Sequence, residues 1–192
     1  QFGLHAFHNG TQTLLGLLKG QKGQIKQKEQ EGVKGQKEPL RLQAMSIQDY
    51  PDLLYRGQML DIARNYTTVD NLKKLIDVLS SYKLNVLHFH FSDDEGWRLE
   101  IPGLEELTTV GARRGYTVDE KECLYPAYNG GYDPLSATSG NGYYTRDEFI
   151  DFLRYAAERH VQVIPEIESP GHARAAIVAP KKLWVCYVNT RK

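Results

Sequence analysis

Ionisable side chains gather at the ends of three apolar stretches of this chain. They are Arg56, Asp61 and Arg64 on or just after the first stretch, His88, His90, Asp93 and Asp94 at the second, and Glu166, Glu168 and His172 at the third. If the stretches are parallel strands, their carboxyl ends lie at the same edge of a sheet, where such folds keep their active sites. The sequence therefore predicts a cluster of arginine, carboxylate and histidine side chains at that edge.

The residue types in this cluster suit the chemistry of a hydrolase. An arginine offers planar donors that can fix vicinal hydroxyls or a carboxylate. An aspartate beside a histidine can set the tautomer of the imidazole and raise its pKa. A plainer interpretation is also open, because Arg56 or Arg64 could form a structural ion pair with Asp61. Taken alone, these residues indicate a hydrolase site of unspecified type.

The second stretch contains an H-x-H pattern. His88 and His90 alternate with Phe89 and therefore share one face of the strand. Backbone groups could satisfy this pair, or the pair could open a metal site, since H-x-H at a strand end is a familiar ligand pattern. Glu166 and Glu168 share one face of the third strand, and a supporting position suits them better than direct catalysis.

Alternating strands and helices must position these side chains. Thr67, with Asp70 three residues later, resembles a capping box, and the apolar residues that follow at helical spacing predict a helix as far as residue 82. The capping box of Thr145 and Glu148 begins a second helix, which runs to about residue 160. Strands are expected at 55–63, 85–91 and 161–167. This strand–helix repeat, with right-handed crossovers, predicts an α/β fold with a parallel sheet.

The first 50 residues have a different composition from the rest. The run 10–18 predicts a short helix, the segment 19–38, rich in Lys, Gln and Gly, predicts a solvated loop, and 40–47 predicts a strand. With 24 basic and 24 acidic residues the formal net charge is zero, so the charge balance gives no reason to expect a nucleic acid or an anionic membrane as partner. No apolar run approaches the length of a membrane span. Cys123 and Cys186 have no metal-ligand spacing and are expected to be free thiols.

Several long motifs, in the correct order, resemble glycoside hydrolase family 20, the β-N-acetylhexosaminidases. They are RGQMLDIARNY, YKLNVLHFHFSDDEGWRLEIPGLEELTTVGA and GYYTRDEFIDFLRYAAERHVQVIPEIESPGHARAAI. The resemblance covers roughly residues 3–179. It implies that residues 51–192 are the N-terminal part of a (β/α)8 TIM barrel, about three strands of it. Residues 1–50 would then be the end of the small α/β domain that precedes the barrel in this family.

The family's activity follows from the same resemblance. Its members remove terminal β-linked N-acetylglucosamine or N-acetylgalactosamine from glycans and glycoconjugates with retention of configuration, and they use no cofactor or metal. The acetamido oxygen of the substrate attacks the anomeric carbon and forms an oxazoline-type intermediate. An aspartate orients the acetamido group, and a glutamate protonates the leaving oxygen and later activates water. Such enzymes are commonly secreted, periplasmic or lysosomal, although no signal segment is present in this chain.

Individual roles can be carried over only where the motifs match. Arg64 matches the arginine that grips the sugar hydroxyls, and Asp93 and His172 match the Asp–His pair that supports the acid/base glutamate. Supporting roles are expected for the other residues within the motifs, which are Arg56, Asp61, His90, Asp94 and Glu168.

One part of the family pattern is missing from the 192 residues. The catalytic Asp-Glu pair normally follows a Gly-Gly-Asp-Glu-like motif after the PGH sequence, whereas all three Asp-Glu dipeptides here precede PGH and none has the Gly-Gly lead-in. We therefore expect a truncated hexosaminidase, or alternatively a non-catalytic remnant with weak sugar binding. Three parallel strands leave open sheet edges, so we also expect marginal stability.

Overall fold

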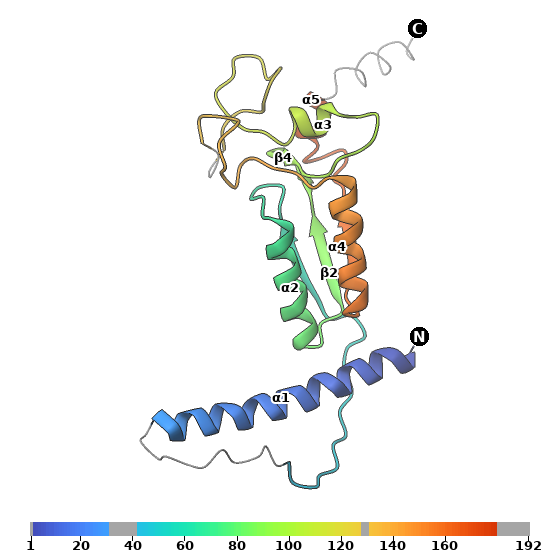
Figure 1. The fold of residues 1–192 in the computed structure, drawn as a ribbon. Coiled ribbons are helices and arrows are strands. Elements are labelled where there is room, and N and C mark those ends of the chain that lie inside the picture. Colours follow the sequence, from blue (N-terminus) through green and yellow to red (C-terminus); the bar gives the residue numbers. More distant parts are fainter. Residues whose placement is uncertain (1, 31–41, 128–130, 180–192) are drawn as a thin grey trace.

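A three-stranded parallel sheet forms the centre of the molecule. The computed structural model describes residues 2–30, 42–127 and 131–179 (Figure 1). Strand β1 (Gly57–Asp61) pairs with β2 (Val86–His90), and β2 pairs with β5 (Gln162–Glu166), so the order is β1-β2-β5. The register aligns Asp61 with His90 and His90 with Glu166. All three strands therefore end at the same level, as the sequence predicted.

Helix α2 (Val69–Ser81) connects β1 to β2. Leu72, Ile76 and Leu79 recur at helical spacing and are buried, which gives the helix one apolar face. The helix begins one residue later than the capping-box prediction. Thr68 is the N-cap, and its side chain accepts a hydrogen bond from the backbone N–H of Asn71.

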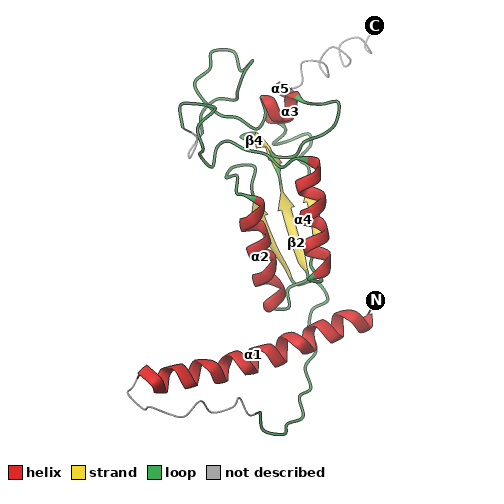
Figure 2. Ribbon diagram, in the orientation of Figure 1, coloured by secondary structure: helices red, strands yellow, loops and turns green. Residues whose placement is uncertain are grey.

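Helix α4 (Arg146–Glu158) connects β2 to β5 and begins as predicted. The Thr145 side chain accepts from the Glu148 backbone N–H, and the Glu148 carboxylate accepts from the Thr145 N–H, which confirms the capping box. Helices α2 and α4 lie beside one another over the sheet (Figures 1 and 2). Both crossovers therefore place their helix against the same face.

The two faces of β2 have different roles. Phe89 points toward the helices, where its ring lies 5.9 Å from that of Phe149 and 5.8 Å from that of Phe152. His88 and His90 point to the opposite face, as their alternation with Phe89 predicted, and both contact Glu166. The apolar core thus lies between the sheet and the helices, and the polar side chains lie on the other face.

A long excursion between β2 and α4 covers the carboxyl end of the sheet. It contains a two-stranded ribbon of β3 (Ser92–Asp93) and β4 (Gly96–Trp97) and the short helix α3 (Glu106–Thr109). Helix α5 (Arg174–Val178) follows β5 and packs against β3 and β4. Cys123 is a buried free thiol, and Cys186 lies outside the described residues.

The N-terminal region differs most from the predictions. Helix α1 extends over Phe2–Gln30, so residues 19–30 of the expected loop are helical, and residues 31–38 lie outside the described part of the chain. Lys and Gln are good helix formers, and their propensity outweighs the cost of the interspersed glycines. Residues 42–47 form no strand. The division into a small domain at 1–50 and a barrel at 51–192 stays a prediction.

Helix α1 lies at the end of the sheet opposite the predicted cluster (Figure 1). His8 Nε2 lies 3.0 Å from the Ser80 hydroxyl of α2, and the Lys83 ammonium donates to the Thr13 hydroxyl and to the Asp49 carboxylate. Among the described residues, no helix is both long and apolar enough to cross a membrane.

Candidate active site at the carboxyl ends of the strands

Asp93 is the centre of the polar cluster. The side chain is 2% exposed and accepts hydrogen bonds through both oxygens. Oδ2 lies 2.7 Å from a terminal nitrogen of Arg64 and 2.8 Å from Nε2 of His90. Oδ1 accepts from the Asp94 backbone N–H at 2.6 Å and lies 3.2 Å from Nδ1 of His172. Burial, the largest influence, raises the pKa of Asp93, but these donors and the charge of Arg64 outweigh it and lower the pKa.

Arg64 reaches the cluster from the loop after β1. Its guanidinium bonds Asp61 at 2.8 Å and Asp93 at 2.7 Å, and Nε lies 3.3 Å from the Glu95 carboxylate. The hydrogen bond that Arg64 donates to Asp61 raises the pKa of Arg64 most, burial opposes it, and the charges of the three carboxylates add to the increase. The side chain remains 40% exposed, so a ligand can still reach one side of the guanidinium. Both interpretations of Arg64, as an ion-pair partner of Asp61 and as a binding residue, are compatible with this geometry.

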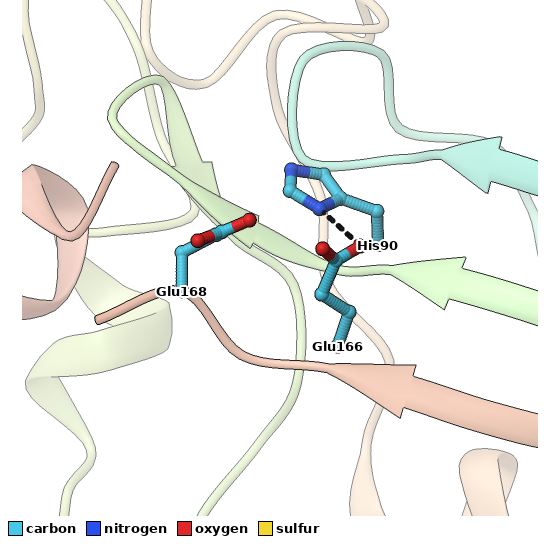
Figure 3. Close-up of side chains that lie close together, drawn as sticks. All are labelled: His90, Glu166 and Glu168. Carbon is cyan, nitrogen blue, oxygen red and sulfur yellow. Dashed lines mark hydrogen bonds and ion pairs between the residues drawn. The ribbon is translucent and has the colours of Figure 1, made fainter. Parts of the chain in front are cut away.

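Glu166 connects the H-x-H pair. Its Oε2 atom lies 2.7 Å from His88 Nε2 and 2.8 Å from His90 Nδ1. Figure 3 shows the Glu166 carboxylate directed at His90, with Glu168 farther along the chain after β5. Ser92 Oγ accepts a hydrogen bond from the Glu168 backbone N–H at 3.3 Å. Glu168 is therefore placed near the cluster by its backbone.

Two groups of side chains have the composition of metal ligands. One comprises His90, Glu166 and Glu168, and the other comprises Asp93, Asp94 and His172; in each group the ligand atoms lie within 4.8 Å of one another. His90 and Glu166 of the first group, and Asp93 and His172 of the second, are also hydrogen-bond partners of each other. The geometry thus fits a proton-sharing network, and the H-x-H metal interpretation stays an alternative.

His172 and Asp94 complete the site. His172 follows the turn after β5, and its backbone φ of +51° is in the left-handed region. Its side chain is 59% exposed, with Nδ1 3.2 Å from Asp93. Asp94 Oδ1 accepts from the Arg174 backbone N–H at 3.0 Å and so ties the start of α5 to β3. One side of the imidazole is therefore anchored, and the rest is open to a ligand or to a further side chain.

Arg56 is not part of this cluster. It precedes β1, at the opposite end of the sheet, and its guanidinium donates to the backbone carbonyls of Lys83 and Leu53 at 2.7 and 2.6 Å. Of the two ion pairs with Asp61 that the sequence left open, the one with Arg64 forms and the one with Arg56 does not. Arg56 instead ties the start of β1 to the turn before β2.

Two buried arginines that the sequence analysis did not select hold the covering excursion in place. Arg98, fully buried, donates to the carbonyls of Ile62, Ala63, Ala112 and Gly142 at 2.7–3.1 Å. Arg114 donates to the carbonyl of Arg64 at 2.5 Å and thereby holds the backbone at Arg64. Burial, helped by the charge of Arg114, lowers the pKa of Arg98 to about 9. In the sequence, Arg98 directly follows Trp97 and Arg114 lies in a loop segment. Neither position predicts a buried arginine.

An open cleft of about 500 Å³ adjoins the cluster. It is lined by Asp94, Glu95, Tyr125, Pro126, Ala127 and Arg174. The Arg174 guanidinium forms an ion pair with Glu120 and lies 5.1 Å from the Tyr125 ring. An aromatic ring beside carboxylates and guanidinium groups is a suitable wall for a polar ligand such as a sugar.

A parallel βαβαβ unit with an Arg–Asp–His cluster at its carboxyl end is the arrangement of a barrel-type enzyme site. The family described as "Glycosyl hydrolase family 20, catalytic domain" matches residues 53–192, so this chain belongs to glycosyl hydrolase family 20. The sheet is accordingly the N-terminal part of that family's TIM barrel, as the resemblance implied.

Proteins with similar sequences support this family membership. The N,N'-diacetylchitobiase of Vibrio harveyi is 48% identical over 138 residues, which are 72% of this chain and 15% of the relative. A beta-hexosaminidase of Porphyromonas gingivalis is 35% identical over 182 residues, 93% of this chain and 20% of the relative. The chain therefore spans about a fifth or less of these two proteins.

A solved structure shows the same local fold. The GH20 exo-β-N-acetylglucosaminidase from Vibrio harveyi, in complex with N-acetylglucosamine, superposes with a TM-score of 0.59 at 44% identity, over 68% of this chain and 19% of that one. An enzyme from Bacteroides fragilis described as a beta-N-acetylhexosaminidase gives a TM-score of 0.56 at 35% identity, over 70% of this chain and 24% of that one.

Proposed function

We propose that the cluster around Asp93 is part of the sugar pocket of a β-N-acetylhexosaminidase, an enzyme that removes terminal β-linked N-acetylglucosamine or N-acetylgalactosamine. The observation that carries the proposal is the buried Asp93, which contacts Arg64 and His172 at the carboxyl edge of the sheet. These three residues occupy the matching positions of the family motifs. The names of the relatives, a chitobiase and several hexosaminidases, support the same substrate class.

Arg64 is the proposed sugar-binding residue. Its contacts with three carboxylates hold the guanidinium plane in one orientation before a ligand arrives, so little freedom is lost on binding. The exposed side of the group can then donate to two neighbouring hydroxyls of the sugar. Asp61 and Glu95 are positioning residues in this proposal, because they act through Arg64.

Asp93 and His172 form the proposed supporting pair. In the substrate-assisted reaction the acetamido oxygen attacks the anomeric carbon, and the leaving oxygen takes a proton from a glutamic acid. Asp93 holds the His172 ring through Nδ1, and a charged Asp93 can adjust the proton affinity of a glutamate placed beside the pair. The Asp–Glu pair that handles the acetamido group and the proton is not among these 192 residues.

The three Asp-Glu dipeptides of the chain have other positions. Glu95 contacts Arg64, Glu148 closes the capping box of α4, and Glu120 pairs with Arg174. This distribution favours a second candidate function for the 192 residues by themselves, which is weak sugar binding without hydrolysis. The two candidates share the Arg64 site and differ in turnover.

A binding measurement tests the proposal. Ligand-observed NMR should detect N-acetylglucosamine and N-acetylgalactosamine on the 192-residue chain, and Arg64→Ala should weaken binding about tenfold or more, because charged hydrogen bonds are lost. Arg154→Ala is the matched control, since Arg154 is 72% exposed on α4 and pairs only with Asp151 at 3.2 Å among the described contacts. Equal binding by the wild type and Arg64→Ala would overturn the assignment.

A further inference from the structure

His90 lies between two carboxylates and contacts both. Nε2 is 2.8 Å from Asp93 Oδ2, Nδ1 is 2.8 Å from Glu166 Oε2, and the side chain is 5% exposed. A neutral imidazole carries one N–H and can donate to only one of these oxygens. Turning the ring over would direct carbon atoms at the carboxylates, so no tautomer or flipped ring satisfies both contacts. The geometry therefore requires an additional proton on the ring or on one of the carboxyl groups.

The charges around the ring place that proton on His90. Carboxylates of Asp61, Asp93, Glu95 and Glu166 gather here, with those of Glu168 and Asp94 close by, and Arg64 contacts the first three of them. No contact between Arg64 and Glu166 is described, so Glu166 depends on the histidines for a counter-charge. His88, which contacts the same Oε2 atom, is 37% exposed and can exchange its proton with water.

The pKa directions agree with this placement. Burial is the largest influence on His90 and lowers its pKa, but the hydrogen bonds to Asp93 and Glu166 and the charges of Asp61 and Glu166 outweigh burial, so the pKa of His90 is raised. For Glu166, burial raises the pKa, and the contacts with His90 and His88 reverse the direction and lower it. The pKa of Asp93 is lowered as well.

We propose that His90 is a positioning residue, held as an imidazolium between Asp93 and Glu166, that fixes Asp93 for its role in the sugar pocket. This inference rests on the proposed function, because it assigns His90 a task within that same site. His90 and Arg64 share one oxygen of Asp93, which leaves the other oxygen directed at His172. A neutral ring would leave either Asp93 or Glu166 without its donor from His90, and in the first case Arg64 alone would hold Oδ2 of Asp93.

The protonation state can be read directly. In ¹⁵N-labelled chain with EDTA present, long-range ¹H–¹⁵N spectra should show both ring nitrogens of His90 protonated at pH 7, with a titration midpoint above the ordinary 6.5. The signal is assigned by its loss in His90→Gln. Glu166→Gln should lower the midpoint by about one unit or more, because an opposite charge is removed. A ring with a single proton and a midpoint at or below 6.5 would overturn the inference.

The pH dependence of sugar binding tests the positioning role of His90. N-acetylglucosamine binding by the wild type should weaken about fivefold as the pH rises through the His90 midpoint, which corresponds to the loss of one hydrogen bond. His90→Gln should bind at the weakened level throughout, without this pH step. His88→Gln is the control, because it alters the other donor to Glu166 and should keep the step. A step that persists in His90→Gln contradicts the role.

The proposed function and the inference about His90 can be distinguished by their failures. If the wild type binds no sugar at any pH, the proposed function and the positioning role both fall, whatever the ring spectra show. If the sugar binds through Arg64 but the His90 ring is neutral, only the inference about His90 is wrong.

Discussion

Asp93 has the most extensively bonded carboxylate of the described cluster, and its environment explains its charge. Four donors surround it within 3.2 Å, so burial does not neutralise the group.

Part of this site could be predicted from the sequence. The period-2 alternation and the parallel strands were enough to bring Asp61, His90 and Glu166 to the same edge, because register in a parallel sheet fixes which residues meet.

Removing the charge of Asp93 should destabilise the fold. Asp93→Asn leaves the buried imidazole and the guanidinium with a neutral partner and forces the amide N–H₂ toward a donor. We expect a loss of about 2–3 kcal/mol in the free energy of unfolding, measured by urea denaturation. Asp151→Asn removes an exposed ion pair and should cost under about 1 kcal/mol. Similar losses for the two variants would show that the cluster is not coupled to stability.

At the scale of elements, the helices that pack on the sheet were predictable and helix α1 was not. Helices α2 and α4 have local caps and an apolar face, and both signals are visible in the sequence. Helix α1 exposes Leu4, Phe7, Leu14 and Leu15, and its position depends on contacts from distant parts of the chain. The His5 and His8 rings lie 4.8 and 4.6 Å from the ring of His160, which follows α4.

The docking of α1 should weaken in acid. The pKa of His8 is lowered by burial and then by the charges of His160 and His5, and that of His160 by burial and His5. A histidine whose folded pKa is depressed stabilises the folded state above its unfolded value of 6.5 and loses that contribution as the pH falls through the folded pKa. Docking should weaken by up to about tenfold for each unit of depression.

Hydrogen exchange can follow this change. Amides of α1 should exchange faster at pH 5 than at pH 7.5 after correction for the intrinsic rates, whereas those of α4 should not. His160→Gln should reduce the pH dependence, because the titration of His160 and its repulsion of His8 are removed, while the burial of His8 remains. The same pH response in His160→Gln and the wild type would exclude the histidine cluster as its cause.

Arg98 secures the excursion between β2 and α4. The sequence could not reveal this role, because the guanidinium is satisfied by backbone carbonyls that only the folded loop brings together. Arg98→Met removes this donor from the carbonyls of Ile62, Ala63 and Gly142, whereas the Ala112 carbonyl keeps the bond from the Gly142 backbone N–H, and the change should cost about 3–5 kcal/mol. Limited proteolysis should then cleave Arg98→Met within residues 113–142. The wild type should resist cleavage there, and so should the control Arg146→Met, which changes an exposed residue of α4. An unaltered cleavage pattern in Arg98→Met would refute this account.

At the scale of the whole molecule, the described sheet has two open edges. Strands β1 and β5 expose Met59 and Ile164 and present unpaired backbone groups, features that favour association with other chains. The family match predicted the barrel class, and the hydrophobic pattern predicted the three strands.

These 192 residues should not hydrolyse an aryl β-N-acetylglucosaminide. In the proposed site Arg64 binds the sugar and Asp93 and His172 form the supporting pair, but no carboxyl group among the described residues of the site matches the acid of the family pattern. A fluorogenic assay should give a rate indistinguishable from that of Asp93→Asn. Turnover typical of a glycosidase, abolished by Asp93→Asn, would show that an acid within this chain had been overlooked.

The most direct test of the central claim is a crystal structure of the chain with N-acetylglucosamine. We expect the sugar at the carboxyl ends of β1, β2 and β5, with its hydroxyls hydrogen-bonded to the Arg64 guanidinium and Asp93 still in contact with Arg64 and His172. A sugar bound elsewhere on the molecule, or bound at this edge without contact to Arg64, would contradict it.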